Sequence, residues 1–159
     1  MPLPNWLPPL LDVSRWTDTT AGQLYEVFIR DFKGVNLHID GQRVSHIPDL
    51  EEDGKESIFW HLVQREDEST GIRLPDLARC ARLPWVAAII SNANQPEVVR
   101  WDYRESKGHI NTYLWLKEFD YVVILRKFDN GGRRLVTAHC VDGSGTKRTL
   151  ERKFKNRMP

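Results

Sequence analysis

The strongest constraint on the fold lies in the C-terminal half of the chain, where four segments resemble β-strands. They cover residues 98–104, 108–116, 121–127 and 133–141, and the turn sequence Asn130-Gly131-Gly132 precedes the last one. Apolar and polar side chains alternate in the first two, and 121–127 is a continuous apolar run, typical of a central strand. A glycine-rich turn between two strands indicates a hairpin. The pattern predicts a four-stranded antiparallel sheet.

The N-terminal half favours helices instead. Apolar residues recur there at helical spacing in three segments, which are residues 20–32, 55–66 and 75–91, the last interrupted at Pro84. A further basic helix, at residues 146–155, can close the chain. Asp40-Gly41 lies between two short alternating runs and predicts a small hairpin. The expected fold class is α+β: a helical N-terminal half with this hairpin, packed on the C-terminal four-stranded antiparallel sheet.

Residues 1–18 are rich in proline and predict an extended arm, which Trp6 and Trp16 are expected to hold against the body. Residues 19–159 predict a single domain, because they contain no repeat and no linker. The arm has no basic start and is not typical of a signal peptide. No apolar run reaches the roughly 18–20 residues that span a membrane. With only two isolated cysteines, Cys80 and Cys140, the expected location is the cytoplasm, without a membrane partner.

Positive charge is concentrated at the C-terminal end, although the net charge of the chain is only +1. Residues 126–157 contain ten lysines and arginines against three acidic residues, whereas residues 1–60 contain ten acidic and five basic residues. Such a local field attracts anions even when the whole molecule is nearly neutral. A polyanion is therefore a candidate partner.

Two histidines are candidates for proton transfer. His139 follows Thr137 by two residues on the last predicted strand, so both side chains should project to one face. His61 lies on the predicted helix 55–66. Metal-independent cleavage of RNA requires a base, an acid and a cation near the phosphate, and histidine can serve as base or acid near neutral pH. The alternatives are a polar cross-strand pair for Thr137 and His139, and a half-buried helix histidine for His61.

Basic residues in two segments could hold the phosphates. Arg73, Arg79 and Arg82 form the first group, where the alternative is a solvated face paired with Asp76. Lys147, Arg148, Arg152 and Lys153 form the second, with few acidic residues nearby, which favours RNA binding. Trp85 is a candidate for stacking on a base. No metal-binding, nucleotide-binding or paired-carboxylate motif is present, so neither a metal nor a cofactor is expected.

Several segments together carry a resemblance to a known family. They include Leu24-Tyr-Glu-Val-Phe-Ile-Arg-Asp-Phe, Phe59-Trp60-His61, the run from Arg73 to Val86, and Tyr121-Val-Val-Ile-Leu followed by Leu135-Val-Thr-Ala-His. From about residue 20 to 155 the chain is similar to the phage-associated branch of the barnase–EndoU–colicin–RelE-like (BECR) nuclease superfamily. The resemblance places His61, Arg79, Arg82 and Thr137 at the polar positions of the family. His139 departs from it, because the family more often has an aromatic residue there, and Gly143-Ser144-Gly145 departs as well.

The resemblance implies a metal-independent endoribonuclease, often a toxin of a toxin–antitoxin, interbacterial or phage system. Such an enzyme cleaves tRNA or mRNA by attack of the 2′-hydroxyl and leaves a 2′,3′-cyclic phosphate. An acidic antitoxin or immunity protein would then cover the basic face. Two alternatives stay open: a non-catalytic module that binds RNA or DNA, and a protein-interaction module on the same fold.

Overall fold

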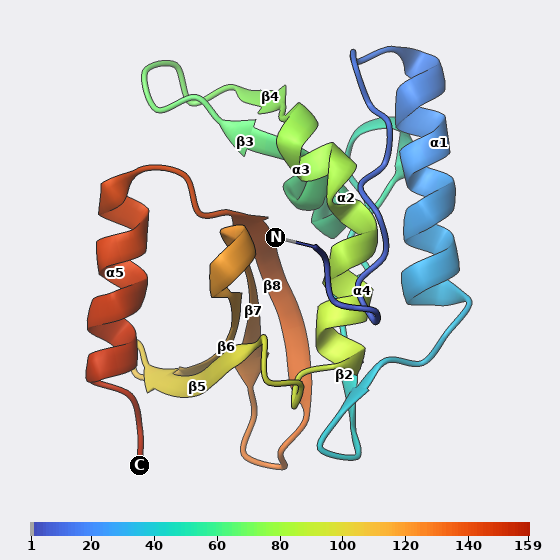
Figure 1. The fold of residues 1–159 in the computed structure, drawn as a ribbon. Helices are drawn as coiled ribbons and strands as arrows, with labels where there is room; N and C mark the ends of the chain where they lie inside the picture. Colours follow the sequence, from blue (N-terminus) through green and yellow to red (C-terminus); the bar gives the residue numbers. More distant parts are fainter. Residues whose placement is uncertain (1) are drawn as a thin grey trace.

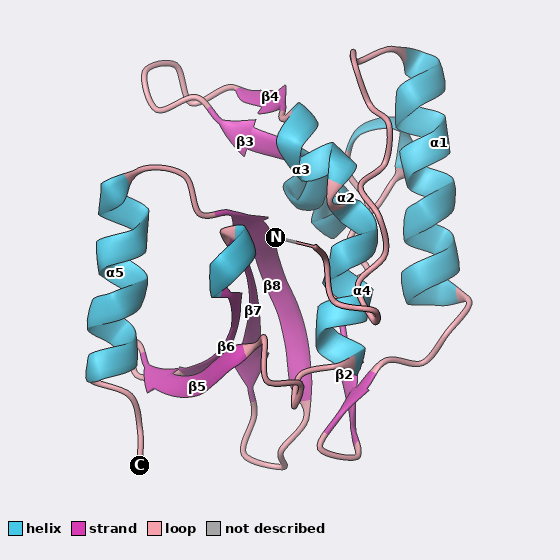
Figure 2. Ribbon diagram, in the orientation of Figure 1, coloured by secondary structure: helices cyan, strands magenta, loops and turns pink. Residues whose placement is uncertain are grey.

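The computed structural model, which describes residues 2–159, has a curved β-sheet with helices on both of its faces (Figure 1). The α-helices are α1 (Asp18–Phe28), α2 (Ser57–Val63), α3 (Leu77–Ala81), α4 (Leu83–Ser91) and α5 (Ser144–Lys155). The strands are β1 (His38–Ile39), β2 (Gln42–Ser45), β3 (Gln64–Glu66), β4 (Arg73–Pro75), β5 (Val99–Arg104), β6 (Ile110–Leu116), β7 (Tyr121–Lys127) and β8 (Arg133–Cys140). Figure 2 separates the helices from the strands by colour.

Six strands form the main sheet, in the order β1-β2-β8-β7-β6-β5. Strands β5 to β8 are consecutive antiparallel neighbours. The small hairpin β1–β2 extends the same sheet, because β2 pairs in parallel with β8 through Val44–Arg133 and Ser45–Arg134. The expected four-stranded antiparallel sheet is therefore wrong: the sheet is mixed and has six strands. Local sequence patterns do not reveal a parallel pairing between segments so far apart in the chain.

The helical half also differs from the expectation after α2. The predicted helix 55–66 ends at Val63, because Gln64 adopts an extended backbone and begins β3, which forms a two-stranded hairpin with β4. The interruption at Pro84 is confirmed, since α3 ends at Ala81 and α4 has the proline in its first turn. The Asp76 carboxylate caps α3 by accepting from the backbone N–H groups of Ala78 and Arg79.

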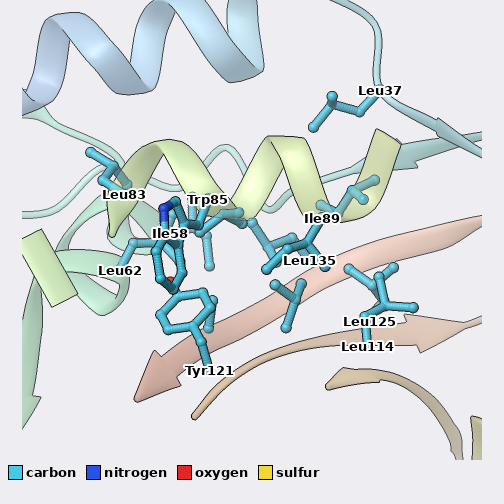
Figure 3. Packing of buried hydrophobic residues seen from close by; sticks show 14 of the residues in the cluster. Leu37, Ile58, Leu62, Leu83, Trp85, Ile89, Leu114, Tyr121, Leu125 and Leu135 are labelled. Atoms are coloured by element: carbon cyan, nitrogen blue, oxygen red, sulfur yellow. The ribbon is translucent and has the colours of Figure 1, made fainter. Parts of the chain in front are cut away.

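Two apolar clusters lie on opposite faces of the sheet. The larger cluster joins α1, α2, α3 and α4 to side chains such as Leu114, Leu125 and Leu135 of the strands. Figure 3 shows this packing, with Trp85 of α4 above Tyr121 of β7. The smaller cluster contains Trp101, Tyr113, Trp115 and Val122 and packs against Leu150 and Phe154 of α5. Helix α5 is thus the helix that covers the second face.

The N-terminal arm is packed against the helices, and α1 begins at Asp18, where the sequence predicts the arm to end. The indole N–H of Trp6 donates to the Glu97 carboxylate at 2.9 Å, and the ring of Trp16 lies 6.3 Å from that of Trp60. The backbone of Pro8 accepts a hydrogen bond from the indole of Trp85, at 2.9 Å. Trp6 and Trp16 hold the arm as expected.

A buried carboxylate connects α1 to the start of α2. Glu56 is 2% exposed, accepts from the Tyr25 hydroxyl at 2.6 Å and pairs with Lys33 at 3.0 Å. Burial opposes its ionisation, but the Tyr25 hydroxyl and the Lys33 ammonium outweigh it, so the pKa of the Glu56 carboxyl lies below its ordinary value. The ionised carboxylate therefore stabilises the folded state at neutral pH.

We expect acid to remove this contribution. Because the folded-state pKa of Glu56 is lowered, its stabilisation is complete above the ordinary glutamate pKa and is lost as the pH falls through the folded-state value. Replacement of Glu56 by glutamine should cost about 1–3 kcal/mol at neutral pH and flatten the loss of stability in acid. Urea unfolding between pH 3 and 7, with the exposed Glu26→Gln as control, measures both effects; identical pH profiles for the two variants would contradict the assignment.

Candidate functional site

Two neighbouring hollows lie along β8, and residues of this strand line both. The His61 hollow, of about 230 Å³, lies between His61, Ser57 and Asp49 on one side and Arg134, Leu135 and Val136 of β8 on the other. The His139 hollow, of about 180 Å³, is lined by His139 and Cys140 with Arg65, Asp76, Arg79, Asp142 and Thr146. These residues come from or adjoin β3, α3, the end of β8 and the start of α5, whose places in the fold can be followed in Figure 1.

The β7–β8 register explains how these residues reach the hollows. Thr137 lies opposite Ile124 and His139 opposite Val122, and both partners pack in the cluster beneath α5. Thr137 and His139 therefore share one face of the strand, as their spacing predicts. The register shifts between Ile124 and Leu125, which leaves Val136 as an extra, 41% exposed residue at a β-bulge.

His139 has a defined tautomer. Its Nδ1 lies 3.0 Å from the carbonyl oxygen of Cys140. A carbonyl oxygen can only accept, so Nδ1 carries the proton and Nε2 of the neutral ring keeps its lone pair. The pKa of His139 lies below its ordinary value, chiefly because burial disfavours the imidazolium, with Arg79 and Arg65 acting in the same direction and the Cys140 carbonyl and Asp142 opposing them. The side chain is therefore a neutral base at pH 7.

Arg79 lines the His139 hollow and is also hydrogen-bonded to the backbone of His61, whose side chain lines the other hollow. Helix α2 ends at Val63 and leaves carbonyl groups without helical partners. The Nη1 group of Arg79 donates to two of them, to His61 at 3.0 Å and to Gln64 at 2.6 Å, and Arg73 donates to Gln64 at 3.0 Å. The Nη2 group of Arg79 donates to no residue in the described part of the chain. Arg79 thus caps α2 and still has two N–H donors for a ligand.

Aspartates partly neutralise the arginines of the His139 hollow. Arg65 lies 3.1 Å from Asp142 and 3.9 Å from Asp76, while the Nε of Arg79 lies 3.6 Å from Asp76. The Arg65–Asp142 pair is exposed, at 54% and 61% of the two side chains, so it contributes little to stability. An incoming anion can therefore replace Asp142 as the partner of Arg65.

His61 lies in its own hollow, half-buried, on α2. Burial lowers the pKa of His61, and Arg73 and Arg79 lower it further, while Glu51 opposes them. The ribonuclease interpretation requires His61, the arginines and the last strand to meet at one place, and the structure meets this requirement only in part. The structure brings His61, Arg79 and β8 together, but it divides the histidines between two hollows.

Other predicted site residues lie elsewhere. Trp85 is 2% exposed and belongs to the core, so its ring cannot stack on a base. The guanidinium of Arg82 lies over the Trp85 ring at 5.2 Å and donates to the Ala78 carbonyl, which gives it a structural role. Thr137 is half-buried and donates to no described side chain or backbone group.

The basic residues of α5 are divided between ligand-accessible and structural positions. Lys147 and Arg148 are exposed, and Arg148 donates to the backbone of Ser144. Arg152 lies 3.4 Å from the Tyr103 hydroxyl. The Lys153 ammonium donates to the Glu105 carboxylate and to the Tyr113 hydroxyl, each at 2.8 Å, so it stabilises the packing of α5 on the sheet. Lys153 is therefore a poor candidate for RNA binding.

Sequence reasoning missed Arg65, Asp142 and Thr146 at the His139 hollow and Arg134 at the His61 hollow. The predicted helix 55–66 includes Arg65, but the residue lies on β3, and the β3–β4 hairpin brings it to Asp142. Arg134 belongs to the ten lysines and arginines of residues 126–157, but no local pattern singles it out among them.

No family model, no curated protein and no solved structure was found to match this chain. Within residues 2–159, no group of three or more His, Cys, Asp or Glu side chains is arranged to hold a metal ion. None of the helices in the same residues combines the length and the apolar character needed to cross a membrane.

Proposed function

We propose that this protein is a metal-independent endoribonuclease whose reaction centre is the His139 hollow. The observation that carries the proposal is the Nδ1–H hydrogen bond from His139 to the Cys140 carbonyl, which leaves a basic Nε2 on a neutral imidazole. Arg79 and Arg65 line the same hollow and offer donors to a phosphate. A neutral base beside guanidinium groups is the arrangement that attack by a 2′-hydroxyl on phosphorus requires.

The reaction follows from these groups. His139 Nε2 takes the proton of the 2′-hydroxyl, and the 2′-oxygen forms a bond to phosphorus while the bond to the 5′-oxygen breaks. Arg79 and Arg65 stabilise the charge of the phosphorane. The leaving 5′-oxygen takes a proton from solvent water, because His61 lines the other hollow. The pKa of His139 is lowered in the free protein, and the phosphate charge raises it on binding. The products are a 2′,3′-cyclic phosphate and a 5′-hydroxyl.

We further propose that the enzyme is a toxin of the BECR type, on the strength of the residues that resemble that superfamily. An acidic antitoxin or immunity protein would suit the excess of basic residues between Arg126 and Arg157. Expression should then arrest bacterial growth, and the His139→Ala variant should not. Equal toxicity of the unaltered protein and the His139→Ala variant, or normal growth with the unaltered protein, contradicts the toxin proposal.

Cleavage of defined RNA in the presence of a chelator tests the enzymatic proposal. The protein should cut single-stranded RNA in excess EDTA and leave 2′,3′-cyclic phosphate ends. It should not cut at a position where the 2′-hydroxyl has been replaced by hydrogen. Cleavage of the 2′-deoxy position, or loss of activity with EDTA, would exclude the mechanism, and binding without cleavage would favour the non-catalytic module.

Asp142 should restrain the binding of RNA. Replacement by asparagine frees Arg65 from its exposed partner and removes a charge that repels phosphate, so affinity for an uncleavable RNA should rise by up to about fivefold, the range of a surface ion pair. The exposed Glu26→Gln, on α1 and outside both hollows, is the matched control for loss of one negative charge. Equal changes in the two dissociation constants, measured at one salt concentration, would contradict a specific role for Asp142.

A further inference from the structure

Two arginines without acidic partners lie where β7 and β8 approach their connecting turn. Arg126 and Arg134 are directly opposite each other in the antiparallel register. Neither pairs with a carboxylate anywhere in residues 2–159. Both guanidinium carbons lie over the ring of Phe128, at 5.5 and 5.3 Å from its centroid, and Phe128 is 37% exposed. Two cations and an aromatic ring therefore share one accessible patch.

Arg133, the residue before Arg134, differs from this pair because it has an acidic partner. Arg133 is 4% exposed, donates to the Thr112 hydroxyl at 2.9 Å and lies 3.4 Å from Asp40, so its charge is compensated. Like charges directly opposite each other weaken a sheet. An anion between Arg126 and Arg134 would remove that repulsion, and arginine offers the planar donor pairs that suit a phosphate.

We propose that Arg126, Phe128 and Arg134 form a subsite for single-stranded RNA. The two guanidinium groups bind a backbone phosphate, and the Phe128 ring stacks on an unpaired base. The choice of RNA as ligand rests on the proposed ribonuclease function. A single strand fits better than a duplex, because the bases of a duplex are already stacked on each other.

Strand β8 connects this subsite to the proposed reaction centre. Arg134 also lines the His61 hollow, and His139 follows five residues later on the same strand. At about 3.3 Å per residue, the strand covers roughly 16 Å between Arg134 and His139. An oligonucleotide can span this distance, whereas a dinucleotide at the His139 hollow cannot reach Phe128. The subsite should therefore matter for long substrates and much less for the shortest one.

Binding of an uncleavable octanucleotide, carrying 2′-O-methyl groups, tests the subsite by fluorescence anisotropy. The Arg126→Gln/Arg134→Gln variant should weaken binding at least about tenfold, because two phosphate contacts are lost. The Arg15→Gln/Lys155→Gln variant removes the same charge at two exposed positions and should change the affinity less than about threefold. The Phe128→Ser variant should weaken binding about tenfold through lost stacking. Thermal unfolding of each variant identifies any loss of structure.

The outcomes separate the subsite from the ribonuclease function. The octanucleotide should lose more cleavage efficiency than a dinucleotide in the Arg126→Gln/Arg134→Gln variant, by at least about tenfold. If the unaltered protein cleaves neither substrate but this variant loses octanucleotide affinity, the enzyme proposal fails and the subsite stands. Equal affinity of this variant and the unaltered protein, or equal losses in the arginine and control variants, overturns the subsite. A duplex that binds as tightly as the single strand also overturns it.

Discussion

RNA cleavage should fall by about 10²–10⁴-fold when His139 is replaced by alanine, which is the usual range for a lost general base. The expectation follows from the hydrogen bond between His139 Nδ1 and the Cys140 carbonyl, since it fixes the tautomer in which Nε2 carries no proton. The loss should appear in single-turnover rates with a defined oligonucleotide. Substrate affinity should change much less, because Arg65 and Arg79 remain.

His38→Ala is the matched control for this substitution. His38 makes the same kind of contact, with Nδ1 3.0 Å from the Asn36 carbonyl, but it is exposed on β1 and lines neither hollow. Its replacement should leave the cleavage rate unaltered. His61→Ala should slow cleavage much less than His139→Ala, because His61 lines the other hollow. Full cleavage in both His61→Ala and His139→Ala would show that neither histidine transfers a proton.

The pH profile gives an independent check on His139. Its pKa lies below the ordinary histidine value, chiefly because of burial. The base is active when neutral, so the acid limb of kcat/KM for the free enzyme should lie at a lower pH than for an exposed histidine. Asp142 raises the pKa of His139, so Asp142→Asn should move this limb to still lower pH. A limb that moves upward in that variant would show that another group titrates.

Much of the fold follows from local patterns, and what was missed depends on long-range contacts. Strands β5 to β8 and the turn at Asn130 follow from alternation and glycine, which are properties of a short window. The parallel pairing of β2 with β8 involves only Val44 and Ser45, and neither carries a distinguishing signal. The β3–β4 hairpin was missed because Gln64–Glu66 is polar and continues the preceding helical pattern, so only its pairing partner decides its conformation.

The sequence predicts which types of residue the candidate site contains better than it predicts where those residues lie in the fold. Thr137 and His139 share a face because the spacing along a strand guarantees it. Burial, however, depends on what packs above a residue. The sequence predicts that Trp85 stacks on an RNA base, whereas in the structure its ring packs against Tyr121. Arg65 reaches Asp142 only through the hairpin, so no sequence window contains that pair.

Replacement of Trp85 by alanine should lower the free energy of unfolding by about 3–5 kcal/mol, the cost of removing a large buried aromatic side chain. The Trp85 ring contacts the rings of Tyr121 and Phe119 edge-on, at 5.6 and 6.4 Å, and Arg82 lies over it. A domain of this size is stable by only about 5–15 kcal/mol, so the variant should be marginally folded. Urea unfolding followed by far-ultraviolet circular dichroism measures the loss.

Trp85→Phe separates packing from the hydrogen bond to the arm. It keeps an aromatic ring but loses the indole N–H that donates to Pro8, so it should cost about 1–2 kcal/mol and speed proteolysis of the arm. The affinity of Trp85→Phe for an uncleavable RNA should equal that of the unaltered protein, because the Trp85 side chain is only 2% exposed. A large loss of RNA affinity in a folded Trp85→Phe variant, with Phe128→Ser as the positive control, would mean that α4 opens toward the ligand. The placement of Trp85 in the core would then describe the free protein only, and base stacking at this position would have to be reconsidered.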